Sequence, residues 1–227
     1  MKKDAQTLVR LASTALKRAG ANDRMAEAAA RHLVHAEEHG LPTHGMSRVP
    51  FYCGMLRKGR ADGQAQPSMV TERAGVCLID NCDGLPYVSA QWAIEELIQR
   101  ARRNGIAFAG IRNSAHVGVM GIHLLPVAQA GMVGFAFTNS PAAIPAWGGK
   151  KALFGTNPVA AVFPRRTRVR RLFVDEITAV RDWQHALKRA IDAGHPRGIL
   201  VVTTGSKAAD LRRESERLRG LVGVSNG

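Results

Sequence analysis

The sequence has few aromatic residues, few cysteines and no long apolar run. Its three cysteines, Cys53, Cys77 and Cys82, show no CxxC spacing, which argues against a disulfide framework or a zinc site. No stretch approaches the ~20 apolar residues of a membrane span. Charged residues also interrupt the N-terminal segment where a signal peptide would have its apolar core. These absences predict a cytoplasmic protein without a bound metal and without membrane association.

Several fingerprints of nucleotide-binding proteins and hydrolases are also missing. The sequence contains no GxGxxG and no GxxxxGK followed by Ser or Thr, which excludes the Rossmann fingerprint and the P-loop. It contains neither GxSxG nor HExxH. Any catalytic site must therefore be built from other motifs.

Positive charge is what the sequence has in excess. The formal net charge is +14, which suggests an anionic partner. The densest basic run, RRTRVRR, lies at residues 165–171. Nucleic-acid binding is therefore one hypothesis, but only 5% of the residues are aromatic and no zinc-finger, RRM or KH signature occurs. A basic surface or linker is the simpler interpretation, and we do not expect a nucleic-acid partner.

Hydrophobic periodicity predicts a helical N-terminal part followed by alternating strands and helices, which is typical of an α/β (α+β) fold. The third helix is expected to begin at Thr43, with Thr43 as its N-cap, and to break or kink at Pro50. Asn22 or Asp23 is expected to cap the helix at 24–38, and Ser89 to cap a later helix that stops at Gly105. Gly131 is the expected C′ residue of another helix. Residues 106–112 are expected to form a buried strand. The expected helices are 4–19, 24–38, 43–57, 89–103, 119–131, 181–193 and 207–219. The expected strands are 76–80, 106–112, 133–138, 158–164, 172–174 and 198–202.

The segment THGMSRVPFY at 43–52 places His44 and Arg48 four residues apart. On a helix this spacing puts both side chains on one face. An imidazole beside a fixed cation can form an acid/base and anion-binding pair. By itself the pair is equally an ordinary solvated helix face.

Three further stretches place polar residues next to expected strands. NSAHVGVMG at 113–121 contains His116 and Gly118, TNSPAAIPAWGG at 138–149 begins with Asn139 and Ser140, and FGTNP ends at Pro158. Polar turns at strand ends are common ligand sites, and glycines allow close approach of a ligand or backbone. Each stretch alone also fits simple turn chemistry.

Taken together, THGMSR, NSAHVG, MVGFAFTNS and FGTNP resemble the type-2 malate/L-lactate dehydrogenases, in the same order over roughly residues 5–180. That group includes ureidoglycolate dehydrogenase, 2,3-diketogulonate reductase and Δ1-piperideine-2-carboxylate reductase. The resemblance implies a cofactor domain with its own, non-Rossmann fold. It also implies a division into a helical part (1–75), a partial NAD(P)-binding domain (76–180) and a basic C-terminal segment (181–227).

The resemblance assigns a role to each motif residue. His44 is the implied catalytic acid/base, and Thr43, where the family has serine, keeps a hydroxyl that can orient the imidazole. Arg48 is the implied partner of the substrate carboxylate, and His116 is the second active-site histidine, expected to contact the substrate. Asp175 is implied to orient His44. The residues implied to contact the cofactor are Gly118, Asn139, Ser140, Thr156, Asn157 and Pro158.

The implied activity is NAD- or NADP-dependent interconversion of 2-oxo (or 2-imino) acids and 2-hydroxy (or 2-amino) acids, in a homodimer. The resemblance ends near Val180, after which the expected P-x-GW and GGxKGYGLA segments are not found. The cofactor domain is therefore expected to be incomplete. Two alternatives follow: a shortened or degenerate relative with weak or no catalysis, and a basic nucleic-acid-binding protein.

Overall fold

The computed structural model describes residues 4–156, 158–164 and 173–174. Helices and strands alternate along the chain, so the predicted mixed α/β fold is confirmed. The helices are α1 (Ala5–Arg18), α2 (Asp23–Glu38), η1 (Pro42–His44), η2 (Met46–Arg48), α3 (Val49–Arg57), α4 (Tyr87–Asn104), α5 (Met120–His123) and α6 (Leu125–Gln129). The strands are β1 (Ser68–Arg73), β2 (Val76–Asp80), β3 (Phe108–Arg112), β4 (Gly134–Phe137), β5 (Ile144–Pro145), β6 (Ala152–Phe154), β7 (Val159–Val162) and β8 (Phe173–Val174).

The chain divides into two compact units. Among the described residues, the first holds 4–134, 162–164 and Phe173, and the second holds 135–156, 158–161 and Val174. The division predicted at residues 75 and 180 stays a prediction, and the elements expected after residue 180 lie outside the described residues.

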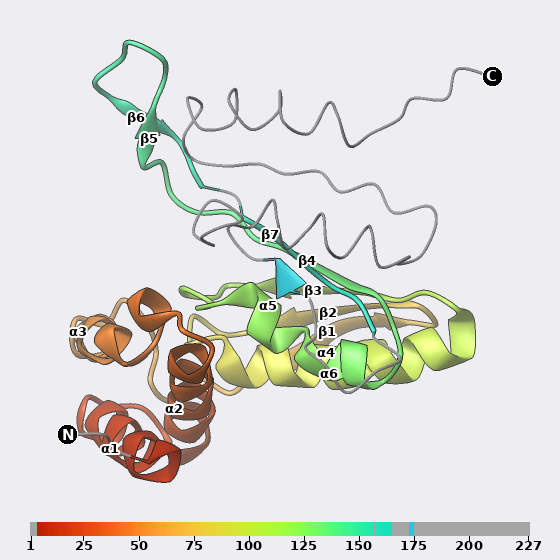
Figure 1. Ribbon diagram of the computed structural model, residues 1–227, viewed down its shortest axis with the longest axis horizontal. Helices are drawn as coiled ribbons and strands as arrows, with labels where there is room; N and C mark the ends of the chain where they lie inside the picture. Colours follow the sequence, from red (N-terminus) through yellow and green to blue (C-terminus); the bar gives the residue numbers. More distant parts are fainter. Residues whose placement is uncertain (1–3, 157, 165–172, 175–227) are drawn as a thin grey trace. The chain divides into compact units, whose positions relative to one another are not determined.

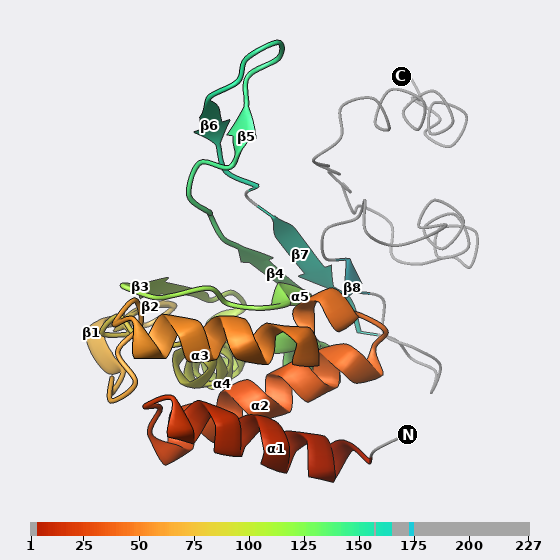
Figure 2. The same ribbon diagram turned by 90° about the vertical axis from the view of Figure 1, so that its left-hand side faces the viewer.

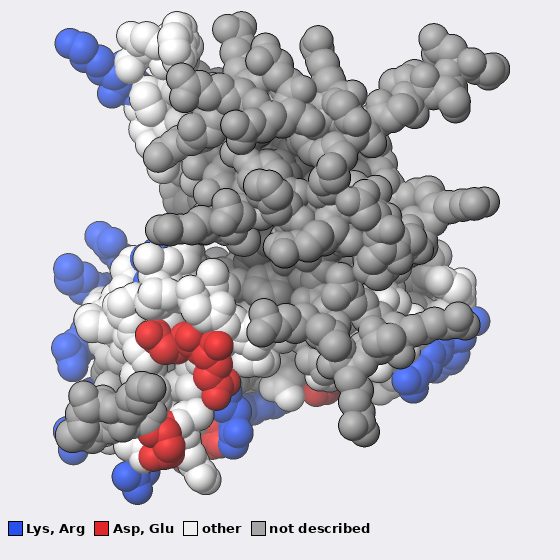
Figure 3. Space-filling view, in the orientation of Figure 1, with Lys and Arg blue, Asp and Glu red and all other residues white. Residues whose placement is uncertain are grey.

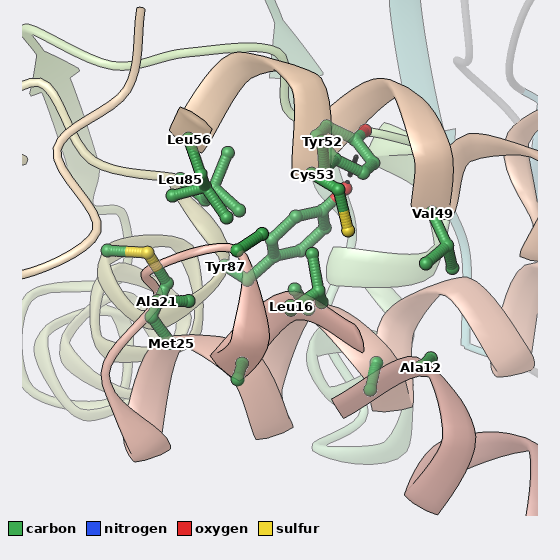
Figure 4. Close-up of a cluster of buried hydrophobic side chains, with 14 of the residues drawn as sticks. Ala12, Leu16, Ala21, Met25, Val49, Tyr52, Cys53, Leu56, Leu85 and Tyr87 are labelled. Atoms are coloured by element: carbon green, nitrogen blue, oxygen red, sulfur yellow. Dashed lines mark hydrogen bonds between the residues drawn. The ribbon is translucent and has the colours of Figure 1, made fainter. Parts of the chain in front are cut away.

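Helices α1, α2 and α3 pack around one apolar core in the first unit (Figures 1, 2). Asp4 caps α1 by accepting a hydrogen bond from the Thr7 N–H at 2.8 Å, and Asn22 caps α2 as predicted. Figure 4 shows the core where the three helices meet. Its side chains include Leu16, Met25, Val49, Tyr52, Leu56, Leu85 and Tyr87. Burial of this apolar surface is the main stabilising term in the unit.

The remainder of the first unit is built on a three-stranded sheet in the order β1-β2-β3. β1 pairs antiparallel with β2, and β2 pairs parallel with β3, so β2, α4 and β3 form a βαβ unit. α4 packs on one face of the sheet (Figure 1), where Cys77 and Ile79 are buried. Val76 and Phe108 lie on the other face, and Phe108 is 63% exposed. The prediction of a buried strand at 106–112 is therefore wrong in its burial, because the described residues leave this face open.

Two predicted helices differ from the observed ones for local reasons. α4 begins at Tyr87 rather than after Ser89, and the Ser89 hydroxyl donates back to the Pro86 carbonyl at 3.0 Å. The helix predicted at 119–131 is divided into α5 and α6, with Pro126 at the start of α6. Gly131 adopts a φ of +79°, as expected for the residue after a helix end.

The second unit contains most of a three-stranded sheet, in the order β4-β7-β8, and the antiparallel hairpin β5–β6. The strands predicted at 133–138 and 158–164 are observed as β4 and β7. The hairpin was not predicted. No helix among the described residues is long and apolar enough to cross a membrane.

Candidate active site

The segment that carries His44 and Arg48 is not one α-helix. Two 3₁₀ turns, η1 and η2, precede α3, which begins at Val49, so the helix start and N-cap predicted at Thr43 are wrong. Pro50 lies in the first turn of α3, where its missing N–H leaves no helical hydrogen bond unmade, and the predicted break does not occur. His44 and Arg48 therefore lie on successive 3₁₀ turns rather than on one face of an α-helix.

Gly45, between the two turns, allows α2 to hold this segment. The Glu37 carboxylate on α2 accepts a hydrogen bond from the Met46 N–H at 2.9 Å. A Cβ at position 45 would overlap the same carboxylate oxygen, although the φ of −97° at Gly45 suits any residue. A larger residue in place of the glycine of the THG motif would therefore displace the Glu37 carboxylate that holds the Met46 N–H.

Thr43 lies in position to orient the His44 ring. The Thr43 Oγ1 is 3.1 Å from the His44 Nδ1, within hydrogen-bond distance. A hydrogen bond to one ring nitrogen restrains rotation of the imidazole and influences which nitrogen holds the proton. This contact supports the orienting role expected for the threonine hydroxyl.

The Arg48 side chain is held from two sides. Its Nε donates to the Thr43 carbonyl oxygen at 2.7 Å, and its guanidinium lies over the Phe51 ring, 5.6 Å from the centroid. No carboxylate pairs with Arg48 among the residues that the structure describes. The two terminal nitrogens form the planar fork that matches a carboxylate.

His116 lies in the loop after β3 and is held through its Nδ1 atom. The Tyr52 hydroxyl is 2.7 Å from this nitrogen, and the Gly118 N–H donates to it at 3.2 Å. Although the residue is exposed as a whole, burial of its inner edge, together with the charges of Arg48 and His44, lowers the pKa of His116 to about 4. His116 is therefore neutral at neutral pH.

The tertiary structure brings three of the predicted site residues together in the first unit. The His44 and His116 rings face each other with centroids 6.2 Å apart and planes inclined by 21°. Arg48 is close enough to lower the pKa of His116. The arrangement combines two imidazoles, which lie in different environments, with a guanidinium that is held in place and can bind an anion.

Two histidines that the sequence did not single out hold the loop that carries His116. The Val119 N–H donates to Nε2 of His32, and Nε2 of His123 lies 2.9 Å from the Val117 carbonyl oxygen. Their rings stack with centroids 4.0 Å apart. Burial lowers the pKa of His123 to about 4 and lowers the pKa of His32 well below its ordinary value. Both rings are therefore neutral supports of the loop at neutral pH.

These buried histidines predict loss of stability in acid. The folded chain resists protonation of His123 until about pH 4, whereas the unfolded chain takes up that proton near 6.5. The stabilising contribution is complete above pH 6.5 and is lost as the pH falls toward 4. We expect the unfolding free energy to fall by about 2 kcal/mol between about pH 7 and about pH 5 from His123 alone. Urea unfolding of the wild type and His123→Leu at both pH values checks this.

The matched control is His39→Gln, which removes an exposed histidine from the end of α2. We expect this variant to keep the pH dependence of the wild type and His123→Leu to reduce it. Equal slopes in all three proteins would contradict the assignment.

Gly118 has both a steric and a conformational requirement for glycine. Its φ is +72°, and an added Cβ would lie 2.9 Å from the Tyr87 hydroxyl and 3.0 Å from Nε2 of His32. Gly131 has nearly the same φ, +79°, but no atom within 4 Å of an added Cβ. We expect Gly131→Ala to lower the unfolding free energy by about 1–2 kcal/mol, and Gly118→Ala by at least about 1 kcal/mol more because of the added crowding. Thermal and urea unfolding measure the difference in unfolding free energy between the two variants. Equal losses of unfolding free energy would show that the neighbours of Gly118 move away without cost.

The predicted cofactor residues of the second unit also lie close to one another. The Ser140 Oγ accepts hydrogen bonds from the Thr156 N–H at 2.9 Å and from the Thr156 hydroxyl at 3.2 Å. Asn139 is exposed beside Ser140, and Pro158 accepts a hydrogen bond from the Thr138 N–H through its carbonyl oxygen. The TNS and FGTNP motifs thus form one local group of hydroxyl and amide side chains. Asn157 and Asp175 lie outside the described residues.

A model of the malate/L-lactate dehydrogenase family matches residues 4–206 of the chain. The chain belongs to the malate/L-lactate dehydrogenase family. It is 39% identical over 164 residues to (2R)-3-sulfolactate dehydrogenase (NADP(+)) of Chromohalobacter salexigens, covering 72% of this chain and 48% of that protein. It is 31% identical over 191 residues to ureidoglycolate dehydrogenase (NAD(+)) of Escherichia coli K12, covering 82% of this chain and 53% of that protein.

A solved structure shows the same fold. Δ1-piperideine-2-carboxylate reductase from Pseudomonas syringae superposes with a TM-score of 0.73 at 28% identity, covering 86% of this chain and 58% of that one. This malate/L-lactate dehydrogenase family member thus spans about half the length of the curated relatives it matches. The resemblance predicted from the four motifs is confirmed.

Several residues that hold the family motifs in place were missed from the sequence. Glu37, Tyr52 and Tyr87 each make a contact that positions a motif residue or its neighbour. One signal was available for the tyrosines, since the chain contains only two and one of them ends the quoted THGMSRVPFY segment. Nothing local in the sequence marked Glu37, because its partner lies nine residues away across a turn.

Proposed function

We propose that this chain is an NAD- or NADP-dependent oxidoreductase that interconverts 2-oxo (or 2-imino) acids with 2-hydroxy (or 2-amino) acids. The observation that carries the proposal is the grouping of His44, Arg48 and His116 in a member of this family. A 2-oxo acid has a carboxylate next to a reactive carbonyl. The grouping offers the Arg48 guanidinium for the carboxylate and two imidazoles for the carbonyl.

In this proposal His44 exchanges the proton. When a 2-oxo acid is reduced, negative charge develops on its carbonyl oxygen, and an imidazolium can neutralise it by donating a proton. In the oxidative direction the same imidazole takes the proton back. Thr43, through its contact with Nδ1, keeps the ring oriented for this transfer, and Asp175 is proposed as the carboxylate that assists it.

Arg48 holds the substrate carboxylate and so fixes the orientation of the neighbouring carbonyl. The Nε contact with Thr43 and the stacking on Phe51 remove most of the freedom of the side chain before substrate arrives. Such preorganisation is worth several kcal/mol of barrier in favourable cases.

The residues of the second unit fit a nicotinamide nucleotide chemically. Asn139, Ser140 and Thr156 supply neutral donors and acceptors, which suit a carboxamide and ribose hydroxyls. Asn157 and Pro158 are further proposed cofactor contacts, as is Gly118 of the first unit. When bound, the nicotinamide supplies or accepts the hydride, and the protein supplies orientation and electrostatics.

The direct test is binding followed by turnover. Titration of the purified chain with NADH and with NADPH, followed by nicotinamide fluorescence, should give saturable binding of at least one. Loss of reduced-nicotinamide absorbance should then depend on added 2-oxo acid or cyclic imine. The absence of saturable binding would overturn the enzyme proposal. Binding without turnover would favour the alternative of a shortened relative with weak catalysis, which the half-length match makes worth testing.

We also propose a homodimer in the cytoplasm, with no nucleic-acid partner. Light scattering of the purified chain measures its mass in solution and so tests the homodimer. On the face seen in Figure 3, the helical part carries a group of Asp and Glu side chains, with Lys and Arg dispersed along its edge. This dispersion does not favour nucleic acid, although RRTRVRR lies outside the described residues. DNA retention that falls with salt and with neutralisation of RRTRVRR would support the alternative.

A further inference from the structure

The only two tyrosines of the chain form a hydrogen-bonded line that ends on His116. The Tyr87 hydroxyl donates to the Tyr52 hydroxyl at 2.7 Å (Figure 4), and the Tyr52 hydroxyl lies 2.7 Å from Nδ1 of His116. Tyr52 and Tyr87 are both buried in the helical core, on α3 and at the start of α4. The line therefore connects the interior of the first unit with the proposed active site.

The direction of these hydrogen bonds can be worked out from Gly118. Its backbone N–H can only donate, and it points at Nδ1 of His116. Nδ1 must therefore be an acceptor without a proton. Tyr52 then donates its own proton to Nδ1 while its oxygen accepts from Tyr87. Because the neutral imidazole holds one proton, that proton is on Nε2.

The tyrosines are suited to remain donors. Burial raises the pKa of Tyr52, and burial raises the pKa of Tyr87 well above its ordinary value, so neither hydroxyl ionises near neutral pH. The titratable and charged groups that face His116 are Arg48, His44 and Tyr52. The charge of Arg48, and that of His44 when its ring is protonated, disfavour an imidazolium at His116. The two hydrogen bonds accepted by Nδ1 favour the neutral ring.

We propose that Tyr52 is a positioning residue that, together with the Gly118 N–H, holds His116 as the neutral Nε2–H tautomer, so that His116 serves as a hydrogen-bond donor to the reacting oxygen or nitrogen and not as a second proton-exchanging acid. The donor role rests on the proposed function, whereas the tautomer does not. The two histidines then divide the work. His44 transfers the proton, and His116 polarises the carbonyl or imine without changing its own protonation state.

Two variants, each of which removes one buried tyrosine hydroxyl, test the positioning role. Tyr52→Phe removes the hydroxyl that contacts His116, and Tyr87→Phe removes an equally buried hydroxyl one step further away. Nitrogen-15 histidine NMR of the ligand-free chain reports the tautomer and the pKa of His116. In the wild type and in Tyr87→Phe we expect the Nε2–H form. In Tyr52→Phe we expect the pKa of His116 to rise, because Nδ1 then accepts a hydrogen bond from Gly118 alone, while the Gly118 N–H keeps the ring in the Nε2–H form.

Two NMR outcomes would overturn the proposal. An Nδ1–H His116 in the wild type would contradict the tautomer, and this measurement does not require any variant to fold. A folded Tyr52→Phe chain in which the pKa of His116 equals that of the wild type would contradict the role of Tyr52. A purely structural role of the tyrosines would instead change both variants alike in stability and leave His116 unchanged.

Kinetics test the donor role separately. Loss of a whole oxyanion donor reduces kcat by about 10²–10³-fold; for Tyr52→Phe we expect a reduction of about tenfold, and for Tyr87→Phe a smaller one. Equal turnover of Tyr52→Phe and wild type would overturn the donor role. A wild type without any turnover would count against the proposed function, while the NMR measurement would still decide the tautomer.

Discussion

Replacing His44 by alanine should reduce kcat for reduction of a 2-oxo acid by about 10²–10⁴-fold, the range attributed to general acid–base catalysis. The reason is that the reduced oxygen would have to take its proton from water, without an oriented donor. The binding of NADH or NADPH should change little, because the loss concerns the chemical step. Steady-state kinetics together with the fluorescence titration measure both quantities on the same sample.

His39→Ala is the matched control for His44→Ala. His39 lies five residues earlier at the end of α2, is exposed, and bonds through Nδ1 to the His35 carbonyl. This variant should keep wild-type turnover. Wild-type kcat in His44→Ala, with circular dichroism showing the same fold, would remove His44 from the acid/base role.

Replacing Arg48 by alanine should raise KM for the 2-oxo acid by about tenfold to a hundredfold, which corresponds to the loss of a hydrogen-bonded charge partner worth about 1.5–3 kcal/mol. Arg48→Lys should restore only part of the affinity, because an ammonium lacks the planar fork. The pKa of His116 should rise in Arg48→Ala, since the arginine charge is one cause of its depression. Kinetics at several substrate concentrations and histidine NMR check the two effects.

Arg57→Ala serves as the control for Arg48, because Arg57 is exposed in the last turn of α3 on the same segment. Its KM should equal that of the wild type. An unchanged KM in Arg48→Ala would show that the carboxylate is held elsewhere. An unchanged His116 pKa would show that the guanidinium does not act on that ring.

Local chemistry explains which parts of the fold were predictable. Asn22 caps α2 as expected, because a side-chain oxygen three residues before an N–H is sufficient to make that bond. Gly105 and Gly131 end helices with positive φ, a conformation that glycine adopts without strain. The βαβ alternation needed only the length and periodicity of β2, α4 and β3.

The wrong predictions concern positions where the same local sequence is compatible with two structures. Pro50 was expected to break a helix, but the same residue suits a first helical turn, and only the two 3₁₀ turns before it decide which applies. The segment 106–112 has the apolar run of a buried strand, yet burial depends on what covers the sheet. In the described residues one face of β3 stays open.

The sequence by itself determined the family, since its four motifs occur in the family's order, and it named the residues of the candidate site. Only the tertiary structure decided which contacts those residues make and how deeply they are buried. Tyr52 and His116 are 64 residues apart, and their hydrogen bond exists because α3, α4 and the loop after β3 pack around one core. That packing partly buries the His116 ring and places the Tyr52 hydroxyl against its Nδ1, so the ring's pKa and tautomer are properties of the folded chain and not of the motif.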